Sequence, residues 1–387
     1  MKFVKLFFVI LFFTAVCVIG FFTLGNNEKV SQLEARNLET FSIPSVEHLL
    51  DGSWESATNE AFSDQLQFRD VFVSAYYKIT FKSYSGDVVE GNNNQLYASQ
   101  QKVDDWDKYE KQLISIANTM NTIADELSKN GTKFIFVSVP RKDAVIQNYL
   151  PKYYTSSDAV YTRAMSVLEE HFNENVIVID AYKIFKNSPT QGYDCYFSTD
   201  HHITFYGGMQ IYTDIMSRIS EDFKDVDVLE VDDYNVSSVT VNGSFNRLIG
   251  NKTVAKPEPL VISLKNKNFT YERTESGKKS QKQIWGTNVN TYAGAYMDDD
   301  NEETIVTTSN ETYPNILITG ASFTNIMETL LVPSCHVMAS VDYRYNDTGK
   351  SLLQYAKQTD ADYVIYIPSQ SNNALSISKM KQHLGIK

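Results

Sequence analysis

The sequence predicts a three-layer α/β domain in which helices cover both faces of a parallel sheet. Two observations support this fold class: runs that are apolar at every position alternate with amphipathic helical stretches, and two of these runs end at the turn residues Pro140 and Gly320. A third observation, one long apolar run at the N-terminus, adds a single transmembrane helix. We therefore expect a membrane anchor at residues 1–25, a polar stalk at residues 26–50 and the α/β domain at residues 51–387.

The N-terminal run predicts both an anchor and its orientation. Lys2 and Lys5 precede an uncharged stretch from Leu6 to Gly25, whose twenty residues span about 30 Å as a helix, the thickness of a bilayer core. This stretch is too long for a typical signal-peptide apolar region, so we predict an uncleaved signal anchor. The basic flank stays in the cytoplasm and the rest of the chain lies outside. A cleaved signal peptide is the alternative, and it gives the same extracytoplasmic location.

The first half of the domain contains strands and helices in alternation. Between Trp106 and Lys129 apolar residues recur every three or four positions, and Asn130-Gly131 is a typical end for such a helix. A buried strand at residues 134–139 follows and stops at Pro140. The pattern then predicts a helix at residues 159–171, a strand at 176–180 and a helix at 204–219.

The second half begins with a change of composition. Residues 221–311 are rich in Asn, Thr, Lys and Asp and contain only short β-branched runs, so we predict a β-rich or loop-rich excursion. The α/β alternation then resumes. It predicts strands at residues 316–319, 337–341 and 363–367, and helices from residue 323 and at residues 351–357.

The charge and the cysteine content exclude two classes of function. The chain of 387 residues has 35 basic and 47 acidic side chains and a net charge of -12, with no long basic run, so we expect no nucleic-acid partner. Three cysteines, at positions 17, 195 and 335, are too few for a disulfide framework or a clustered zinc site. Cys195 and Cys335 each lie close in sequence to one of the motifs described next, so a disulfide between them and two free thiols both stay open.

The first motif places a serine at the edge of the predicted sheet. Gly320-Ala321-Ser322-Phe323 directly follows an apolar strand and precedes a helix. Ligands of open α/β folds bind at this carboxyl edge, and the N–H groups of the helix N-terminus can stabilise an oxyanion. The alternative is a tight turn with a helix cap.

The second motif combines an aspartate with two histidines. In Thr199-Asp200-His201-His202, Asp200 precedes His202 by two residues, so both side chains lie on the same side of an extended segment and the carboxylate can orient the imidazole. A capping Asp200 with exposed histidines is one alternative, and a metal site is another. A metal requires further ligands, and no other His, Cys or Asp cluster has suitable spacing, so we predict no metal.

The two motifs together form the arrangement that activates a serine hydroxyl. Ser322 is the predicted nucleophile, His202 the base and Asp200 the orienting acid. His201 is the rival base, and in an extended segment it points away from Ser322. Asn325, Arg344 and His201 are further candidates for contacts with substrate or an oxyanion. Three aromatic residues, Trp285, Tyr292 and Tyr296, either stack on sugar rings or pack in the protein.

Several shorter pieces accompany the two motifs in a fixed order. They are residues 64–70, Val139-Pro140, Tyr149-Leu150-Pro151, Gly207-Gly208, Gly243-Ser244-Phe245 and residues 341–344. From about residue 45 to the end, this series resembles the DHHW family, which is related to the alginate O-acetyltransferase group with SGNH-hydrolase-like domains. Two residues depart from the family's pattern: Ile203 stands where tryptophan is expected, and Ala321 where many relatives have aspartate or threonine.

The resemblance implies a fold, a site and an activity. The fold is the SGNH-hydrolase-like, flavodoxin-like kind, and Ser322, His202 and Asp200 match the family's nucleophile, base and acid. The activity is an extracytoplasmic O-acyltransferase that acetylates a cell-surface or secreted polysaccharide through a covalent acyl-enzyme. It needs no cofactor, and a membrane-bound O-acyltransferase is the expected partner that supplies the acetyl group. The alternatives are a carbohydrate esterase with the same triad and a non-catalytic polysaccharide-assembly or surface protein.

Overall fold

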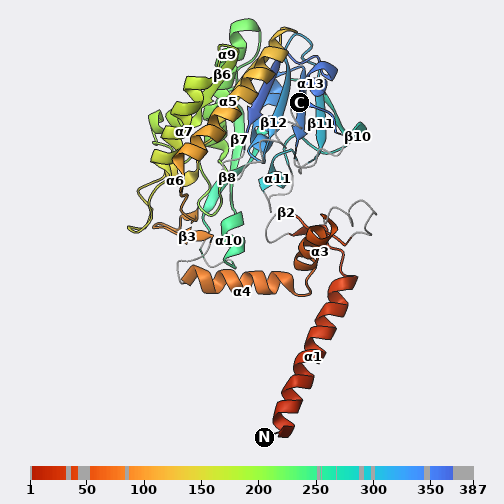
Figure 1. Ribbon diagram of the computed structural model, residues 1–387. Helices are drawn as coiled ribbons and strands as arrows, with labels where there is room; N and C mark the ends of the chain where they lie inside the picture. Colours follow the sequence, from red (N-terminus) through yellow and green to blue (C-terminus); the bar gives the residue numbers. More distant parts are fainter. Residues whose placement is uncertain are drawn as a thin grey trace. The chain divides into compact units, whose positions relative to one another are not determined.

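An eight-stranded mixed sheet forms the centre of the larger of the chain's two units (Figure 1). The larger unit comprises residues 90–243 and 254–387, and the smaller unit comprises residues 1–89 and 244–253. The computed structural model describes the following residues of the two units: 2–31, 36–41, 53–82, 87–250, 253, 255–266, 268–286, 292–297, 301–343 and 349–368.

The sheet has the strand order β10-β9-β11-β13-β12-β14-β5-β6. The five strands from β13 to β6 in this order are parallel, and they are the five strands predicted from the sequence. The other three are antiparallel, so the predicted parallel sheet is part of a larger mixed sheet. The strands are β5 (Lys133–Ser138), β6 (Val176–Asp180), β9 (Tyr271–Glu275), β10 (Lys278–Ser280), β11 (Glu303–Thr308), β12 (Asn315–Gly320), β13 (Val337–Asp342) and β14 (Tyr363–Ile367).

Helices cover both faces of the sheet because its parallel strands are apolar on both sides. In β5, Phe134 and Phe136 pack into one core, and Ile135 and Val137 pack into the other. The first core also contains α5 (Trp106–Ser128), α7 (Asp158–His171) and α13 (Leu352–Gln358), and the second contains α8 (Ala181–Asn187), α9 (Phe205–Asp222) and α12 (Thr324–Leu331). The predicted three-layer α/β fold is thereby confirmed.

The three antiparallel strands come from the region predicted to be β-rich, residues 221–311. β9 and β10 join through Ser276 and Gly277, whose φ angles of 44° and 75° are the positive values that a tight two-residue hairpin turn requires. β11 then pairs with both β9 and β13, so this region extends the central sheet. The same region contains a separate pair of strands, β7 (Tyr234–Thr240) and β8 (Pro257–Leu264).

The larger unit also contains several short elements. One of them is the strand β4 (Leu96–Ala98), and the strand β3 (Val88–Glu90) contains the point in the chain at which the smaller unit ends and the larger one begins. The others are α6 (Lys142–Val145), α11 (Tyr292–Ala295) and the 3₁₀ turns η1 (Val231–Asp233) and η2 (Val332–Ser334).

The smaller unit contains the helices α1 (Lys2–Gly25), α3 (Ser53–Asp64), α4 (Arg69–Lys82) and α10 (Ser244–Leu248), with the strand pair β1 (Val30–Ser31) and β2 (Arg36–Asn37). Within the described residues, Phe3–Gly25 of α1 is the one helical stretch long and apolar enough to cross a membrane, a property that anchors and signal sequences share. The division into an anchor, a stalk at 26–50 and a domain from 51 stays a prediction. Residues 32–35 and 42–50 of the stalk lie outside the described residues.

Candidate active site

Asp200 and His202 lie in a tight loop that leads into α9. Tyr196 and Ile203 form an antiparallel bridge at the base of this loop, and His202 O accepts a 3.2 Å hydrogen bond from Phe197 N. At its tip, Asp200 Oδ1 accepts the backbone N–H of His201 at 2.6 Å and that of His202 at 3.1 Å. The segment is therefore a closed loop and not the extended segment that we predicted.

Ser322 lies at the carboxyl edge of the sheet, between β12 and α12. A side chain at Gly320 would collide with the carbonyl oxygen of Ile367 on β14, so glycine allows the two strands to pair up to this point. Ala321 N then donates a 3.2 Å hydrogen bond to the same carbonyl. This pairing fixes the turn that carries Ser322.

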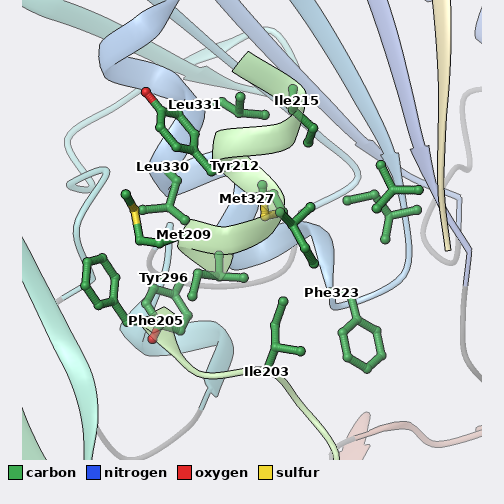
Figure 2. Packing of buried hydrophobic residues seen from close by; sticks show 14 of the residues in the cluster. Ile203, Phe205, Met209, Tyr212, Ile215, Tyr296, Phe323, Met327, Leu330 and Leu331 are labelled. Atoms are coloured by element: carbon green, nitrogen blue, oxygen red, sulfur yellow. The ribbon is translucent and has the colours of Figure 1, made fainter. Parts of the chain in front are cut away.

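Close packing of α9 against α12 brings the two motifs together. Gly208 faces α12 so closely that an added Cβ would lie 2.9 Å from Ile326 Cδ1. Figure 2 shows Met209 and Tyr212 of α9 in the same apolar cluster as Met327 and Leu330 of α12. Because α9 begins just after the histidine loop and α12 just after the serine, their contact places the two side chains side by side.

A continuous line of hydrogen bonds joins the three predicted residues. Ser322 Oγ lies 2.7 Å from His202 Nε2, and His202 Nδ1 lies 2.8 Å from Asp200 Oδ1. Burial acts to raise the pKa of Asp200, but the charges and hydrogen bonds of the two histidines outweigh it and hold the pKa well below its usual range. An ionised carboxylate only accepts hydrogen bonds, so Nδ1 of His202 carries a proton and Nε2 can accept the proton of Ser322. This is the geometry of a serine poised for general-base activation.

The side chain of His201 lies against that of His202. The two imidazole rings are 3.9 Å apart, and His201 Nδ1 lies 3.2 Å from the same Asp200 oxygen. The two neighbouring rings can lie together because side chains alternate between two sides only in an extended segment, and this loop is closed. His201 is 38% exposed and His202 is 10% exposed, so His201 is the histidine that faces solvent.

Aromatic rings surround the imidazole of His202. Tyr292, at the start of α11, stacks on it with ring centroids 3.9 Å apart and planes 8° apart. Phe323 approaches at 5.2 Å with a tilt of 48°. Tyr292 and Tyr296 are both buried, so they pack inside the protein and do not stack on sugar rings. The contact of Tyr292 with His202 was not predicted, because nothing local to residue 292 indicates it.

A buried lysine, Lys142 of α6, holds the backbone next to the loop that carries Asp200 and His202. Its Nζ donates to the carbonyl oxygens of Leu96, Phe197 and Ser198 at 2.9, 2.7 and 2.6 Å. Burial lowers the pKa of Lys142 to about 7. Glu258 Oε1 accepts the N–H of Ser198 at 2.6 Å, so a cation and a carboxylate together hold the backbone that leads to Asp200.

Gly243 also supports this loop, which gives a physical reason for a glycine in Gly243-Ser244-Phe245. Its N–H donates a 3.1 Å hydrogen bond to Thr199 Oγ1. A Cβ at this position would lie 2.7 Å from the Cβ of Asp200, which is closer than packed atoms approach.

Of the other residues proposed to contact substrate or an oxyanion, the structure describes Asn325 but not Arg344. Asn325 is buried in the first turn of α12, and its N–H lies 3.4 Å from Ser322 O. Within the described part of the chain, no protein acceptor takes the backbone N–H of Ser322 or Phe323. Arg344 lies outside the described residues.

The two buried cysteines are free thiols, so the disulfide considered from the sequence is not formed. Cys195 Sγ contacts Gln210 Nε2 at 3.3 Å, and Cys335 Sγ contacts the carbonyl oxygen of Val332 at 3.4 Å. Cys335 precedes β13, whereas Ser322 follows the parallel neighbour β12. Cys335 therefore lies at the opposite edge of the sheet from Ser322, although the two residues are close in sequence.

Asp200, His201 and His202 also have the composition of a metal site, with one ligand atom of each within 4.8 Å of the others. The 2.8 Å between His202 Nδ1 and Asp200 Oδ1 is a hydrogen-bond distance. Tetrahedral zinc, with bonds of about 2.0–2.1 Å, holds its ligand atoms roughly 3.3 Å apart. The distance between His202 and Asp200 therefore suits proton transfer better than two ligands of one zinc ion.

Comparison with known proteins gives a family and a fold. Residues 88–291, more than half of the chain, match the model of a family described as "SGNH hydrolase-like domain, acetyltransferase AlgX". The structure of Bacillus cereus PatB1 with a sulfonyl adduct superimposes with a TM-score of 0.59 at 19% identity, covering 75% of this chain and 96% of that one. A DHHW family protein from Eubacterium siraeum has a TM-score of 0.59 at 16% identity, with 77% and 95% covered. None of the curated proteins compared matches the sequence. The fold and the relationships that the motifs predicted are thereby confirmed.

Proposed function

Because the chain belongs to the acetyltransferase AlgX family with an SGNH-hydrolase-like domain, we propose that it transfers acetyl groups to hydroxyls of a polysaccharide outside the cytoplasm. The observation that carries this proposal is the line of hydrogen bonds from Ser322 through His202 to Asp200. A hydroxyl is a poor nucleophile at neutral pH, and an adjacent oriented base is the usual means of activating it.

In the first half of the reaction, Ser322 Oγ attacks the carbonyl carbon of the acetyl donor while its proton passes to His202 Nε2. The tetrahedral intermediate carries a negative oxygen, for which the N–H groups of Ser322 and Phe323 at the start of α12 are the proposed donors. The intermediate collapses as the bond to the leaving group breaks, and the leaving group takes the proton from His202. Ser322 then carries the acetyl ester, and Asp200 has stabilised the transient imidazolium.

In the second half, a sugar hydroxyl attacks the acetyl-serine. Its proton passes to His202 Nε2, a second tetrahedral intermediate forms, and the serine oxygen leaves with the proton from the imidazolium. The acetyl group is now an ester of the sugar and the protein is unchanged. A carbohydrate esterase would use the same residues with water as the acceptor, so the acceptor distinguishes the two activities.

The proposed location and donor follow from α1 and from the family. α1 anchors the chain with the catalytic unit outside the cell membrane, where acetyl-coenzyme A is not expected. A membrane-bound O-acyltransferase would then deliver the acetyl group from the cytoplasmic side. The apolar length of Phe3–Gly25 supports the anchor.

The test of this function is trapping of the acetyl-enzyme. The full chain in detergent is mixed with an aryl acetate and quenched with acid, and peptide mass spectrometry is expected to find one acetyl group on Ser322 and none in Ser322→Ala. An oligosaccharide added before the quench should discharge the ester and become acetylated. An aryl sulfonyl fluoride should modify the same serine, since PatB1 forms a sulfonyl adduct.

Two results would contradict the proposal. Acetate released only to water with every oligosaccharide tried would indicate the esterase. Absence of both acetyl and sulfonyl groups on Ser322 would indicate the non-catalytic surface protein.

Tyr292→Leu is expected to alter the pH dependence of this activity. The tyrosine face stacked on His202 stabilises the imidazolium by a cation–π interaction of about 1 kcal/mol, so its loss should lower kcat by roughly fivefold. Protonation of the free base becomes harder, so the acid limb of the pH–rate profile moves to lower pH. Tyr292→Phe keeps the ring and should leave the profile in place. Equal profiles for all three proteins would show that Tyr292 only fills space.

A further inference from the structure

Apolar side chains lie exposed at the start of α4, in the smaller unit. Phe68, Val71 and Phe72 are 60%, 64% and 52% exposed. Val71 and Phe72 lie in the first turn of α4, and Ile79, 71% exposed, continues their face two turns later. Phe68 lies just before the helix with a φ of 64°, and its carbonyl oxygen accepts the backbone N–H groups of Val71 and Phe72. Exposed large apolar residues that share one helix face indicate an interaction surface.

Hydrogen bonds fix this surface at the end of α1. Gln67 N, one residue before Phe68, donates to Thr23 Oγ1 at 3.0 Å, and Asn26 Nδ2 donates to Gln65 O at 3.2 Å. Thr23 is fully buried, although the helix to which it belongs is otherwise largely exposed. The first turn of α4 therefore begins at the level of the last turn of α1.

The side chain of Gln65 fastens this junction to the strand pair that follows α1. Its Nε2 donates to Glu28 O and Glu39 O, both at 2.8 Å, and its Oε1 accepts the N–H of Glu28 at 2.9 Å. Asp64 adds a 2.9 Å hydrogen bond from Glu39 N and an ion pair with Arg69 at 3.6 Å. These contacts account for the Asp, Gln and Arg of residues 64–70, a motif that the proposed chemistry does not use.

Exposed apolar side chains connect the two helices. Phe21, Phe22 and Leu24 at the end of α1 are exposed, and together with Gln67 they line a hollow beside the junction. The hydrogen bonds of Gln67 and Asn26 hold the start of α4 next to this end of α1. The medium that surrounds the end of α1 therefore also reaches the exposed face of α4, and for a membrane anchor that medium is lipid.

We propose that α4 lies in the outer interface of the lipid bilayer, with Phe68, Val71 and Phe72 inserted among the acyl chains. This inference rests on the anchoring role of α1 in the proposed function. α1 spans about 35 Å and ends where the bilayer's headgroup region begins, so α4 leaves it at the depth at which amphipathic helices bind. The fourteen residues of α4 would add an in-plane contact of about 21 Å to the single crossing.

Spin labels at matched positions test the inference. The full chain, with Cys17→Ala to remove the exposed thiol, receives one nitroxide at Phe72→Cys, Val71→Cys, Asp70→Cys or Ile10→Cys, and is reconstituted into phosphatidylethanolamine–phosphatidylglycerol vesicles. Asp70 is exposed on the opposite face of the same turn and is the matched control. Collision with oxygen reports lipid, and collision with a neutral nickel chelate reports water.

Labels at residues 71 and 72 are expected to collide several-fold more with oxygen than with nickel, and the label at 70 should show the reverse. If residue 10 is embedded but residues 71 and 72 match residue 70, the inference is wrong while the anchor stands. Protection of the labels at 71 and 72 from both reagents would mean that a protein, such as a second copy of this chain, covers this face of α4. That result would also show that the inference is wrong. If residue 10 itself meets nickel freely, the anchor fails and the inference fails with it, whereas acetylation of Ser322 is measured independently.

Discussion

Replacing Ser322 with alanine is expected to lower kcat/KM for acetyl transfer by on the order of 10³-fold or more, and His202→Ala should do the same. Each change removes one end of the 2.7 Å hydrogen bond through which the hydroxyl loses its proton. The double variant should be scarcely worse than either single variant, because the two groups act as one unit. Initial rates with an aryl acetate and an oligosaccharide acceptor measure this.

His201→Ala is the matched control for this prediction. It removes an adjacent imidazole that contacts Asp200 but, as far as the described contacts go, not Ser322. We expect a much smaller loss of activity than for His202→Ala. Full activity of the double variant Ser322→Ala/His202→Ala would mean that the reaction takes place at another site. A greater loss of activity in His201→Ala than in His202→Ala would mean that His201 is the base.

Lys142→Met is expected to reduce the free energy of unfolding at pH 7 by about 3–5 kcal/mol. The carbonyl oxygens of Leu96, Phe197 and Ser198 would lose their shared donor, and the buried carboxylate of Glu258 would lose its cationic neighbour. Urea unfolding followed by circular dichroism measures the difference. Lys129→Met, on an exposed lysine, should change stability by at most about 0.5 kcal/mol.

The pH dependence of the same pair of proteins gives a second test. Burial holds the pKa of Lys142 at about 7, below the value of about 10.4 in an unfolded chain, so between these values the unfolded state binds more protons. The wild-type protein should therefore gain stability relative to Lys142→Met as the pH rises from 7 to 10. A constant difference across this range would mean that Lys142 stays charged in the fold.

The sequence was sufficient for those features that local chemistry determines. Ser322 could be found because an apolar strand, a glycine and a helix start are all encoded within a few residues. The five parallel strands could be found because each is largely apolar. β10 has only three residues, and β9 and β11 contain several charged residues and threonines, so these three strands gave no such signal. Their antiparallel pairing onto β13 depends on a contact between residues far apart in the chain.

The sequence predicted that Ser322, His202 and Asp200 form the site, but it did not predict the shape of the loop that brings them together. Asp200 and His202 are close because a loop closes over Lys142, Glu258 and Gly243, three residues separated from it by about 40 to 60 positions. No pattern within residues 199–202 shows that closure, so the contact between the rings of His201 and His202 could not be predicted. Tyr292 was considered only as a sugar-stacking or packing residue, because its partner His202 lies 90 positions earlier in the chain.

The enclosure of the His202 imidazole restricts the order of events at the site. The ring contacts both Tyr292 and His201 at 3.9 Å, and each of its nitrogens has a hydrogen-bond partner, so a flip about the Cβ–Cγ bond would break both hydrogen bonds. In the proposed reaction every proton must therefore enter and leave by the same atom, Nε2. The departing alcohol of the donor and the incoming sugar hydroxyl then occupy one position in turn, never together. Product alcohol should accordingly compete with the oligosaccharide, raising its apparent KM without lowering the rate at saturation.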